Sequence, residues 1–294
     1  MAQYAPGQLI DRYQLANLIA RGGMGEVWKA WDNELHVDVA LKRVNLADPD
    51  ATADDWAEAV ARARVEARIG ARLRRHPNVV TVFDVVTEAD GMPWLVMDYV
   101  EGRTLLDQLK TNGPLHEDEA AKIAGAMLDA LQAAHAAGIM HRDIKPGNVL
   151  LGVEGSVFLS DFGIAKRLTD TSMTVTGKIL ASFEYAAPER IEPTLGDPDG
   201  TAADLFSLGV TLYEAVEGIS PFRQDPPSFL TTINAICTKP HPPMTRAKRL
   251  APLINQLLAK NPADRPGIDE ARTLLVGKGQ DRTEKAEPQP PPPP

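Results

Sequence analysis

The chain has 294 residues, 44% of them hydrophobic and 24% charged, proportions that suit a soluble globular protein and exclude a disordered, collagen-like or disulfide-scaffold chain. With 40 acidic and 31 basic residues its net charge is −9, so its surface repels phosphate and anionic lipid, and neither nucleic acid nor membrane is the expected partner. Cys237, the single cysteine, excludes an intrachain disulfide and indicates a reducing, cytoplasmic setting.

The first hundred residues are predicted to be rich in strands. Short apolar runs punctuated by Gly, Asp and Asn are typical of hairpins. We expect strands at 13–19, 25–31, 37–44, 79–87 and 94–99, with one helix at roughly 53–75.

Two stripes run along that predicted helix. Val65, Ile69 and Leu73 recur every four residues and predict an apolar face. Arg64, Arg68 and Arg72 form the second stripe, which we expect to face solvent.

Beyond Gly102 the apolar periodicity changes to that of helices. Helices are expected at 104–111, 117–137, 201–217, 226–237, 247–259 and 268–275. A strand-rich first third and a helix-rich remainder predict an α+β fold in two lobes. We place the small lobe at residues 1–97, the large lobe at 98–277, and a disordered proline-rich tail at 278–294.

A glycine-dense segment, ARGGMGEV at residues 20–27, lies between the first two predicted strands. Glycines let a backbone approach phosphate closely, but alone the segment favours a plain hairpin. Because a strand follows, it is not a Rossmann or Walker loop. Lys42 ends a nearby strand; if it is buried, Glu66 on the following helix is placed to neutralise it.

Three motifs then follow in a fixed order. His141-Arg142-Asp143-Ile144-Lys145-Pro146-Gly147-Asn148 comes first, Asp161-Phe162-Gly163 second and Ala187-Pro188-Glu189 third. Each tripeptide is uninformative alone. Together, and after a glycine loop and a strand lysine, they make the chain closely resemble a eukaryotic-type serine/threonine protein kinase of the bacterial branch, over about residues 10–276.

The resemblance implies a bilobal kinase fold and transfer of the γ-phosphoryl group of ATP to Ser or Thr hydroxyls of proteins. Asp143 looks like the base that orients the substrate hydroxyl, and Lys145 like the residue that steadies the γ-phosphate. A lysine at the latter position is typical of kinases that act on Ser and Thr. Lys42, paired with Glu66, looks like the lysine that holds the α- and β-phosphates.

Nucleotide and metal ligands are implied in the same way. Asp161 and Asn148 look like the ligands of Mg²⁺, or of Mn²⁺ in its place. The backbone C=O of Asp98 and N–H of Val100 would bind the edge of the adenine. The resemblance adds further contacts of the phosphate loop and adenine pocket at Ile19, Arg21, Gly22, Gly23, Gly25, Val27, Ala40, Lys42, Met97 and Leu150.

Three positions depart from the family pattern. Ala20 stands where the phosphate loop usually begins with glycine, and its methyl group is expected to loosen nucleotide binding without abolishing it. Phe206 stands where tryptophan is more usual, which we interpret as a packing change alone. Ser182 replaces a threonine and keeps its hydroxyl.

Other residues match structural positions of the family. Glu189 and Arg265 look like a buried ion pair that joins the substrate-side loop to the lower lobe. Asp204 looks like the helix residue that braces the catalytic-loop backbone.

Threonines are dense between Gly163 and Ala187, which is usually the mark of a polar loop. The resemblance implies autophosphorylation at Thr174 and Thr176, with Arg142 pairing with the phosphate.

Two other classes remain open. A pseudokinase or scaffold module is disfavoured because the motif residues are all in place. A small-molecule kinase of the aminoglycoside or choline type is disfavoured by the Ala187-Pro188-Glu189 segment. The expected partners are protein substrates and ATP, with a homodimer for trans-autophosphorylation. We expect no membrane segment in this chain and a location in the cytoplasm. There the chain would be either a separate protein or the cytosolic part of a longer membrane-anchored kinase.

Overall fold

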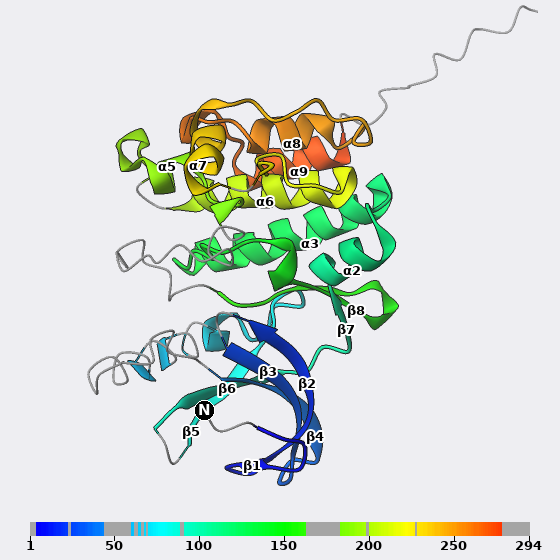
Figure 1. Cartoon of the computed structure of the whole chain (residues 1–294), viewed down its shortest axis with the longest axis vertical. Coiled ribbons are helices and arrows are strands. Elements are labelled where there is room, and N and C mark those ends of the chain that lie inside the picture. Colours follow the sequence, from blue (N-terminus) through cyan, green and yellow to red (C-terminus); the bar gives the residue numbers. More distant parts are fainter. Residues whose placement is uncertain are drawn as a thin grey trace, which may run out of the picture.

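The structure, a computed structural model, describes residues 4–22, 25–43, 60–61, 64–65, 68, 70–88, 91–162, 183–197, 200–226 and 228–277. Figure 1 shows a curled antiparallel sheet at one end of the molecule and stacked helices at the other. The α+β, two-lobed fold predicted from the sequence is therefore confirmed.

Within the described residues, the sheet lobe has six strands in the order β1-β2-β3-β4-β6-β5, and every neighbouring pair is antiparallel. Its strands are β1 (Leu9–Ile10), β2 (Tyr13–Gly22), β3 (Gly25–Asp32), β4 (Val37–Arg43), β5 (Val82–Thr87) and β6 (Pro93–Asp98). Successive side chains of a strand point to opposite faces. Val39 and Leu41 of β4 thus join a core with Trp28 and Trp94, whereas Ala40 and Lys42 occupy the other face.

All five strands predicted for this lobe are present. β5 begins later than expected because Val79 forms an isolated bridge with Leu159 instead of extending the strand. β1, with two residues, is too short to leave a periodic signal.

The helix predicted at 53–75 is described only in part, and residues 60–61, 64–65, 68 and 70–73 are helical. Arg64, Arg68 and Arg72 are exposed, as predicted. Leu73 is buried, but Val65 is 39% exposed, so the predicted apolar face does not hold at Val65. Eight residues advance a helix by about 80° beyond two full turns, so the two side chains need not share an environment. Ile69 lies outside the described residues.

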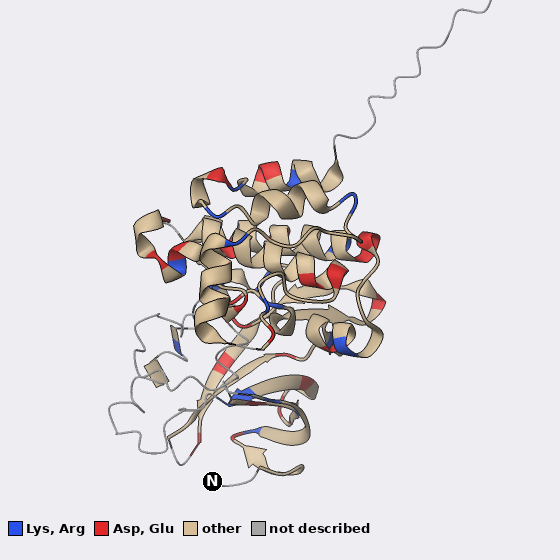
Figure 2. Ribbon diagram, turned by 45° about the horizontal axis from the view of Figure 1, so that its top comes forward, with Lys and Arg blue, Asp and Glu red and all other residues tan. Residues whose placement is uncertain are grey.

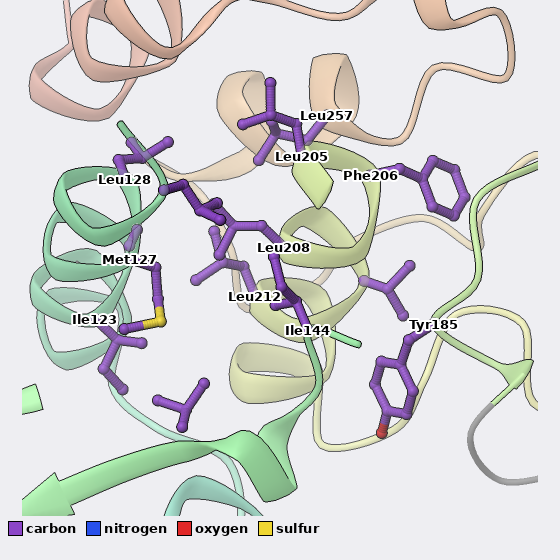
Figure 3. Close-up of a cluster of buried hydrophobic side chains, with 14 of the residues drawn as sticks. Ile123, Met127, Leu128, Ile144, Tyr185, Leu205, Phe206, Leu208, Leu212 and Leu257 are labelled. Carbon is purple, nitrogen blue, oxygen red and sulfur yellow. The ribbon is translucent and has the colours of Figure 1, made fainter. Parts of the chain in front are cut away.

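The helical lobe is built around α3 and α6. Its helices are α2 (Leu105–Asn112), α3 (Glu117–Ala136), α5 (Pro188–Ile191), α6 (Thr201–Glu217), α7 (Phe229–Thr238), α8 (Ala251–Leu257) and α9 (Ile268–Val276). In Figure 3, Met127 of α3 lies near Leu208 of α6 in a fully buried core. Gly209 lets α8 approach α6 closely, because an added Cβ would lie 2.8 Å from Cβ of Leu257.

The six helices predicted beyond Gly102 are all present, and α6 has its predicted bounds. A second sheet was not foreseen: β7 (Gly102–Thr104), β8 (Val149–Gly152) and β9 (Val157–Leu159) pair antiparallel between the lobes. These strands have three or four residues, too few for a clear alternation. Among the described helices, none is both long and apolar enough to cross a membrane.

Charged residues are interspersed on the helical lobe, where Figure 2 shows Lys and Arg beside Asp and Glu. One exposed ion pair joins Arg249 to Asp118 at 2.9 Å. Opposite charges therefore neutralise one another locally.

A buried ion pair ties α5 to the segment before α9. Arg265 donates to both carboxylate oxygens of Glu189, at 2.5 and 2.8 Å, and both side chains are almost inaccessible. Its guanidinium also donates to the carbonyls of Ala202, Ala259 and Lys260. Phe206 lies under the same guanidinium, 4.9 Å from it, and stacks on Phe222, so phenylalanine fills this position in the core.

Replacing Arg265 with methionine is expected to lower the free energy of unfolding by about 3–5 kcal/mol, because Glu189 is left as an uncompensated buried charge. Urea unfolding followed by circular dichroism measures the change. The control is Arg249→Met, which breaks an exposed pair and should cost less than about 1 kcal/mol. Equal losses for the two variants would contradict a structural role for the buried pair.

Candidate active site

A buried carboxylate from α6 holds the loop at residues 141–148. Asp204 is 1% exposed, and its two oxygens accept the N–H groups of His141 and Arg142 at 2.8 and 2.7 Å. His135 Nε2 lies 2.9 Å from the same carboxylate. Arg142 has a left-handed backbone with φ of 66°, which costs a non-glycine residue about 1–2 kcal/mol. The bonds to Asp204 offset that cost and keep the loop in its turn.

Three predicted site residues converge within this loop. Lys145 Nζ lies 2.7 Å from Asp143 Oδ2. The Asn148 amide nitrogen donates to the same oxygen at 3.1 Å and to the Asp143 carbonyl at 2.7 Å. Because the nitrogen of the amide is used toward Asp143, the Asn148 oxygen is turned away from it. The loop thus presents a carboxylate, an ammonium group and an amide oxygen side by side.

An ion pair crosses from the sheet lobe to this loop region. Lys42 Nζ of β4 lies 2.7 Å from Oδ1 of Asp161, which follows β9. Lys42 is 7% exposed, so its charge is largely removed from water and the pair is only weakly screened. Glu66, the predicted partner of Lys42, lies outside the described residues.

His141 joins the loop to the segment that carries Asp161. Its Nδ1 accepts the N–H of Asp143 at 3.2 Å, so Nε2 carries the ring proton and donates to the Ser160 carbonyl at 2.8 Å. Burial lowers the pKa of His141, which keeps the ring neutral and this arrangement of donor and acceptor intact. The ring also packs against Phe162, with 4.7 Å between centroids.

Most of the apolar residues predicted to enclose the adenine gather at the boundary between the lobes. Ala40 and Met97 are buried there, and Val27, Val100 and Leu150 pack against them. These residues come from β3, β4, β6 and β8 and from the segment after β6, so both lobes contribute.

The remaining adenine-site residues lie at the edge of this cluster. Ile19 lies at a β-bulge of β2 and is 51% exposed; it does not join the buried cluster. Asp98 ends β6, where its N–H donates to the Thr81 carbonyl at 2.9 Å and its carboxylate accepts the Thr81 N–H at 3.0 Å. These two bonds fix the chain at Asp98, two residues before Val100.

The described part of the predicted phosphate loop lies at the end of β2 and the start of β3, which pair as neighbouring antiparallel strands. Gly22 pairs with Gly25, and Gly25 has a φ of 129°, a conformation that favours glycine. Arg21 forms an ion pair with Glu26 across the hairpin at 2.9 Å. Gly23 lies outside the described residues.

The predicted phosphorylation sites, Thr174 and Thr176, lie in residues 163–182, outside the described part of the chain, as does Ser182. Arg142, their expected counterpart, has an exposed side chain. Within the described residues, no carboxylate pairs with its guanidinium.

A polar network beside α5, in which Glu184, Tyr185 and Glu214 are buried and Arg223 is exposed, was not foreseen. The Tyr185 hydroxyl donates to Glu214 at 2.5 Å, and Arg223 donates to both oxygens of Glu184 at 3.1 to 3.3 Å. Burial raises the pKa of Tyr185 and of Glu214. No spacing in the sequence pairs these residues, because α6 brings Glu214 to Tyr185 only in the folded chain.

Comparison with known proteins shows the family of this chain. Residues 13–274 match the model of the protein kinase domain family. The serine/threonine-protein kinase PknA of Mycobacterium tuberculosis (strain H37Ra) is 38% identical over 291 residues, which cover 95% of this chain and 65% of the relative. The serine/threonine-protein kinase PknB of Mycobacterium leprae (strain TN) is 37% identical over 271 residues, covering 88% of this chain and 42% of the relative.

The chain therefore spans about two fifths of the length of the PknB relative and under two thirds of the length of the PknA relative. The family match itself extends from β2 to α9 and includes every described element of the candidate site. This chain belongs to the protein kinase domain family.

Proposed function

We propose that this chain transfers the γ-phosphoryl group of ATP to serine and threonine hydroxyls of proteins, in a reaction that depends on Mg²⁺. The observation that supports this most is the 2.7 Å ion pair between Lys42 and Asp161, which aligns the sheet lobe with the loop that carries Asp143. Phosphoryl transfer needs mainly positioning and charge neutralisation. A cation from one lobe beside carboxylates from the other meets that need.

The donor set fits a divalent cation. Asp161 offers a carboxylate, and Asn148 offers its amide oxygen because its nitrogen is engaged by Asp143. Mg²⁺ prefers hard oxygen ligands and is usually held by one or two protein groups together with substrate phosphates. When bound here, Mg²⁺ would neutralise charge on the β- and γ-phosphates.

Each remaining side chain has one task in this proposal. Lys42 holds the α- and β-phosphates, oriented by Glu66. Asp143 accepts a hydrogen bond from the substrate hydroxyl and aligns it for in-line attack. Lys145, already 2.7 Å from Asp143 Oδ2, is placed to bind the γ-phosphate as charge moves toward the leaving group.

ATP would bind with its adenine in the cluster around Ala40 and Met97. The backbone carbonyl of Asp98 and the N–H of Val100 would pair with its edge. Ile19 and the glycines of the β2–β3 turn would cover the ribose and phosphates, where Ala20 adds a methyl group. The serine and threonine preference rests on Lys145 and on relatives named serine/threonine-protein kinases.

Replacing Asp143 with asparagine is expected to lower the rate of phosphoryl transfer at least about a hundredfold, because the group that orients and accepts the hydroxyl proton is lost. Affinity for ATP should be retained. The measurement is incorporation of γ-labelled phosphate from ATP with Mg²⁺ into a generic protein substrate, with ATP binding measured in parallel. The matched control is Asp118→Asn, an exposed helical carboxylate.

The same assay, repeated with an aminoglycoside and with choline as acceptors, separates the competing functions. If the chain is a pseudokinase or scaffold, neither the unmodified chain nor Asp143→Asn will transfer label. If it is a small-molecule kinase, the aminoglycoside or choline will be labelled and the protein substrate will not. Equal transfer by the unmodified chain and Asp143→Asn would contradict the proposed role of Asp143.

We also propose that the kinase activates itself by phosphorylating Thr174 and Thr176, in trans within a homodimer. The exposed guanidinium of Arg142 supports this, since it can pair with a phosphate. Arg142 directly precedes Asp143 in the chain, so such a pair would act next to the proposed base.

Phosphatase-treated protein is expected to regain activity during preincubation with ATP and Mg²⁺, whereas the Thr174→Ala/Thr176→Ala variant should gain nothing. Initial rates before and after preincubation measure this, with Thr111→Ala on α2 as the control. An equal gain in the double variant would contradict activation at these sites.

A further inference from the structure

The peptide group between Arg142 and Asp143 is held at both of its polar ends. Its N–H, on Asp143, donates to Nδ1 of His141 at 3.2 Å. Its carbonyl, on Arg142, accepts a hydrogen bond from the guanidinium of Arg190. These two contacts fix the peptide plane that leads into Asp143, and with it the backbone position from which the carboxylate that would receive the substrate hydroxyl extends.

Arg190 reaches the loop from a rigid support. It lies on α5 directly after Glu189, whose buried ion pair with Arg265 anchors that helix. Its side chain is partly buried. Burial lowers the pKa of Arg190, and the neighbouring charge of Arg142 acts in the same direction, while Asp204 and Asp143 oppose it. Arg190 is therefore close enough to Asp143 and Asp204 to feel both carboxylates.

We propose that Arg190 is a positioning residue for phosphoryl transfer, which holds the Arg142 carbonyl and so fixes the orientation of Asp143. This inference rests on the proposed kinase function. Asp204 holds the N–H groups of His141 and Arg142, and Arg190 holds the carbonyl of Arg142.

The backbone strain at Arg142 gives this contact its importance. A left-handed residue outside glycine persists only where its surroundings hold it, and a bond from a charged donor is about twice as strong as a neutral one. Without Arg190 the peptide group keeps its N–H contact but loses its carbonyl contact, so the backbone at Asp143 can shift and carry the carboxylate away from the hydroxyl.

The test compares Arg190→Gln and Arg190→Lys with the unmodified chain and with Arg249→Gln, an exposed arginine paired only with a surface acid among the described residues. The measurements are kcat for a peptide substrate, the KM for ATP, and the melting temperature. We expect Arg190→Gln to lower kcat roughly tenfold to a hundredfold, the equivalent of one hydrogen bond to a charged group. The KM for ATP should stay unchanged, because the hydrogen bond of Arg190 goes to the Arg142 carbonyl and not to a residue proposed to bind the nucleotide.

Arg190→Lys keeps a cationic donor and should give an intermediate kcat. An Arg190→Gln kcat within about twofold of the unmodified value would overturn the proposal. So would parallel changes in kcat, KM for ATP and melting temperature, which indicate a purely structural role. If Arg190→Gln does not fold, Arg190→Lys decides on the same criteria. A lower kcat at unchanged KM for ATP supports the proposal, and a kcat equal to that of the unmodified chain overturns it. An inactive unmodified chain would instead contradict the proposed function.

Discussion

The buried carboxylate of Asp204 is the constraint on which the candidate site depends. It is supplied by α6, the most deeply buried of the described helices in the large lobe, and it accepts two consecutive backbone N–H groups of residues 141–148, the proposed catalytic loop. A charge at 1% exposure is tolerable only when it is fully hydrogen-bonded. The N–H groups of His141 and Arg142 meet that requirement, and in return the loop is held in a strained turn that presents Asp143. The packing of α6 against α3 and α8 therefore fixes the position of Asp204, and through the loop the position of Asp143.

The contact between the lobes extends this arrangement to the sheet. His141 donates a hydrogen bond to the Ser160 carbonyl and packs on Phe162. These contacts of the loop therefore hold the segment that carries Asp161 in position. Lys42 then reaches Asp161 from β4. A displaced loop would therefore disturb Asp143, the proposed base, together with the proposed metal ligand Asp161 and with Lys42, because each is held by the one before it.

The parts that sequence could predict were those carried by local pattern. Asp143 and Asn148 lie within one eight-residue motif, so their proximity follows from the chain itself, and the bounds of α6 follow from its apolar periodicity. The contacts of Arg190 with the catalytic loop and of Tyr185 with Glu214 could not be predicted, because they join residues 48 and 29 positions apart through tertiary packing. The exposure of Val65 shows the same limit. Helical spacing predicts which side of the helix a residue lies on, but not whether another part of the protein packs against it there.

The most direct measurement is the rate of peptide phosphorylation by the Asp204→Asn variant at saturating ATP. Asparagine keeps the shape but replaces one acceptor oxygen with an NH₂ group, which must face the N–H of His141 or Arg142 and cannot accept it. If Asp204 holds the loop as described, kcat falls at least about tenfold while ATP still binds. A folded Asp204→Asn variant with an unchanged kcat would contradict the dependence of the site on this carboxylate.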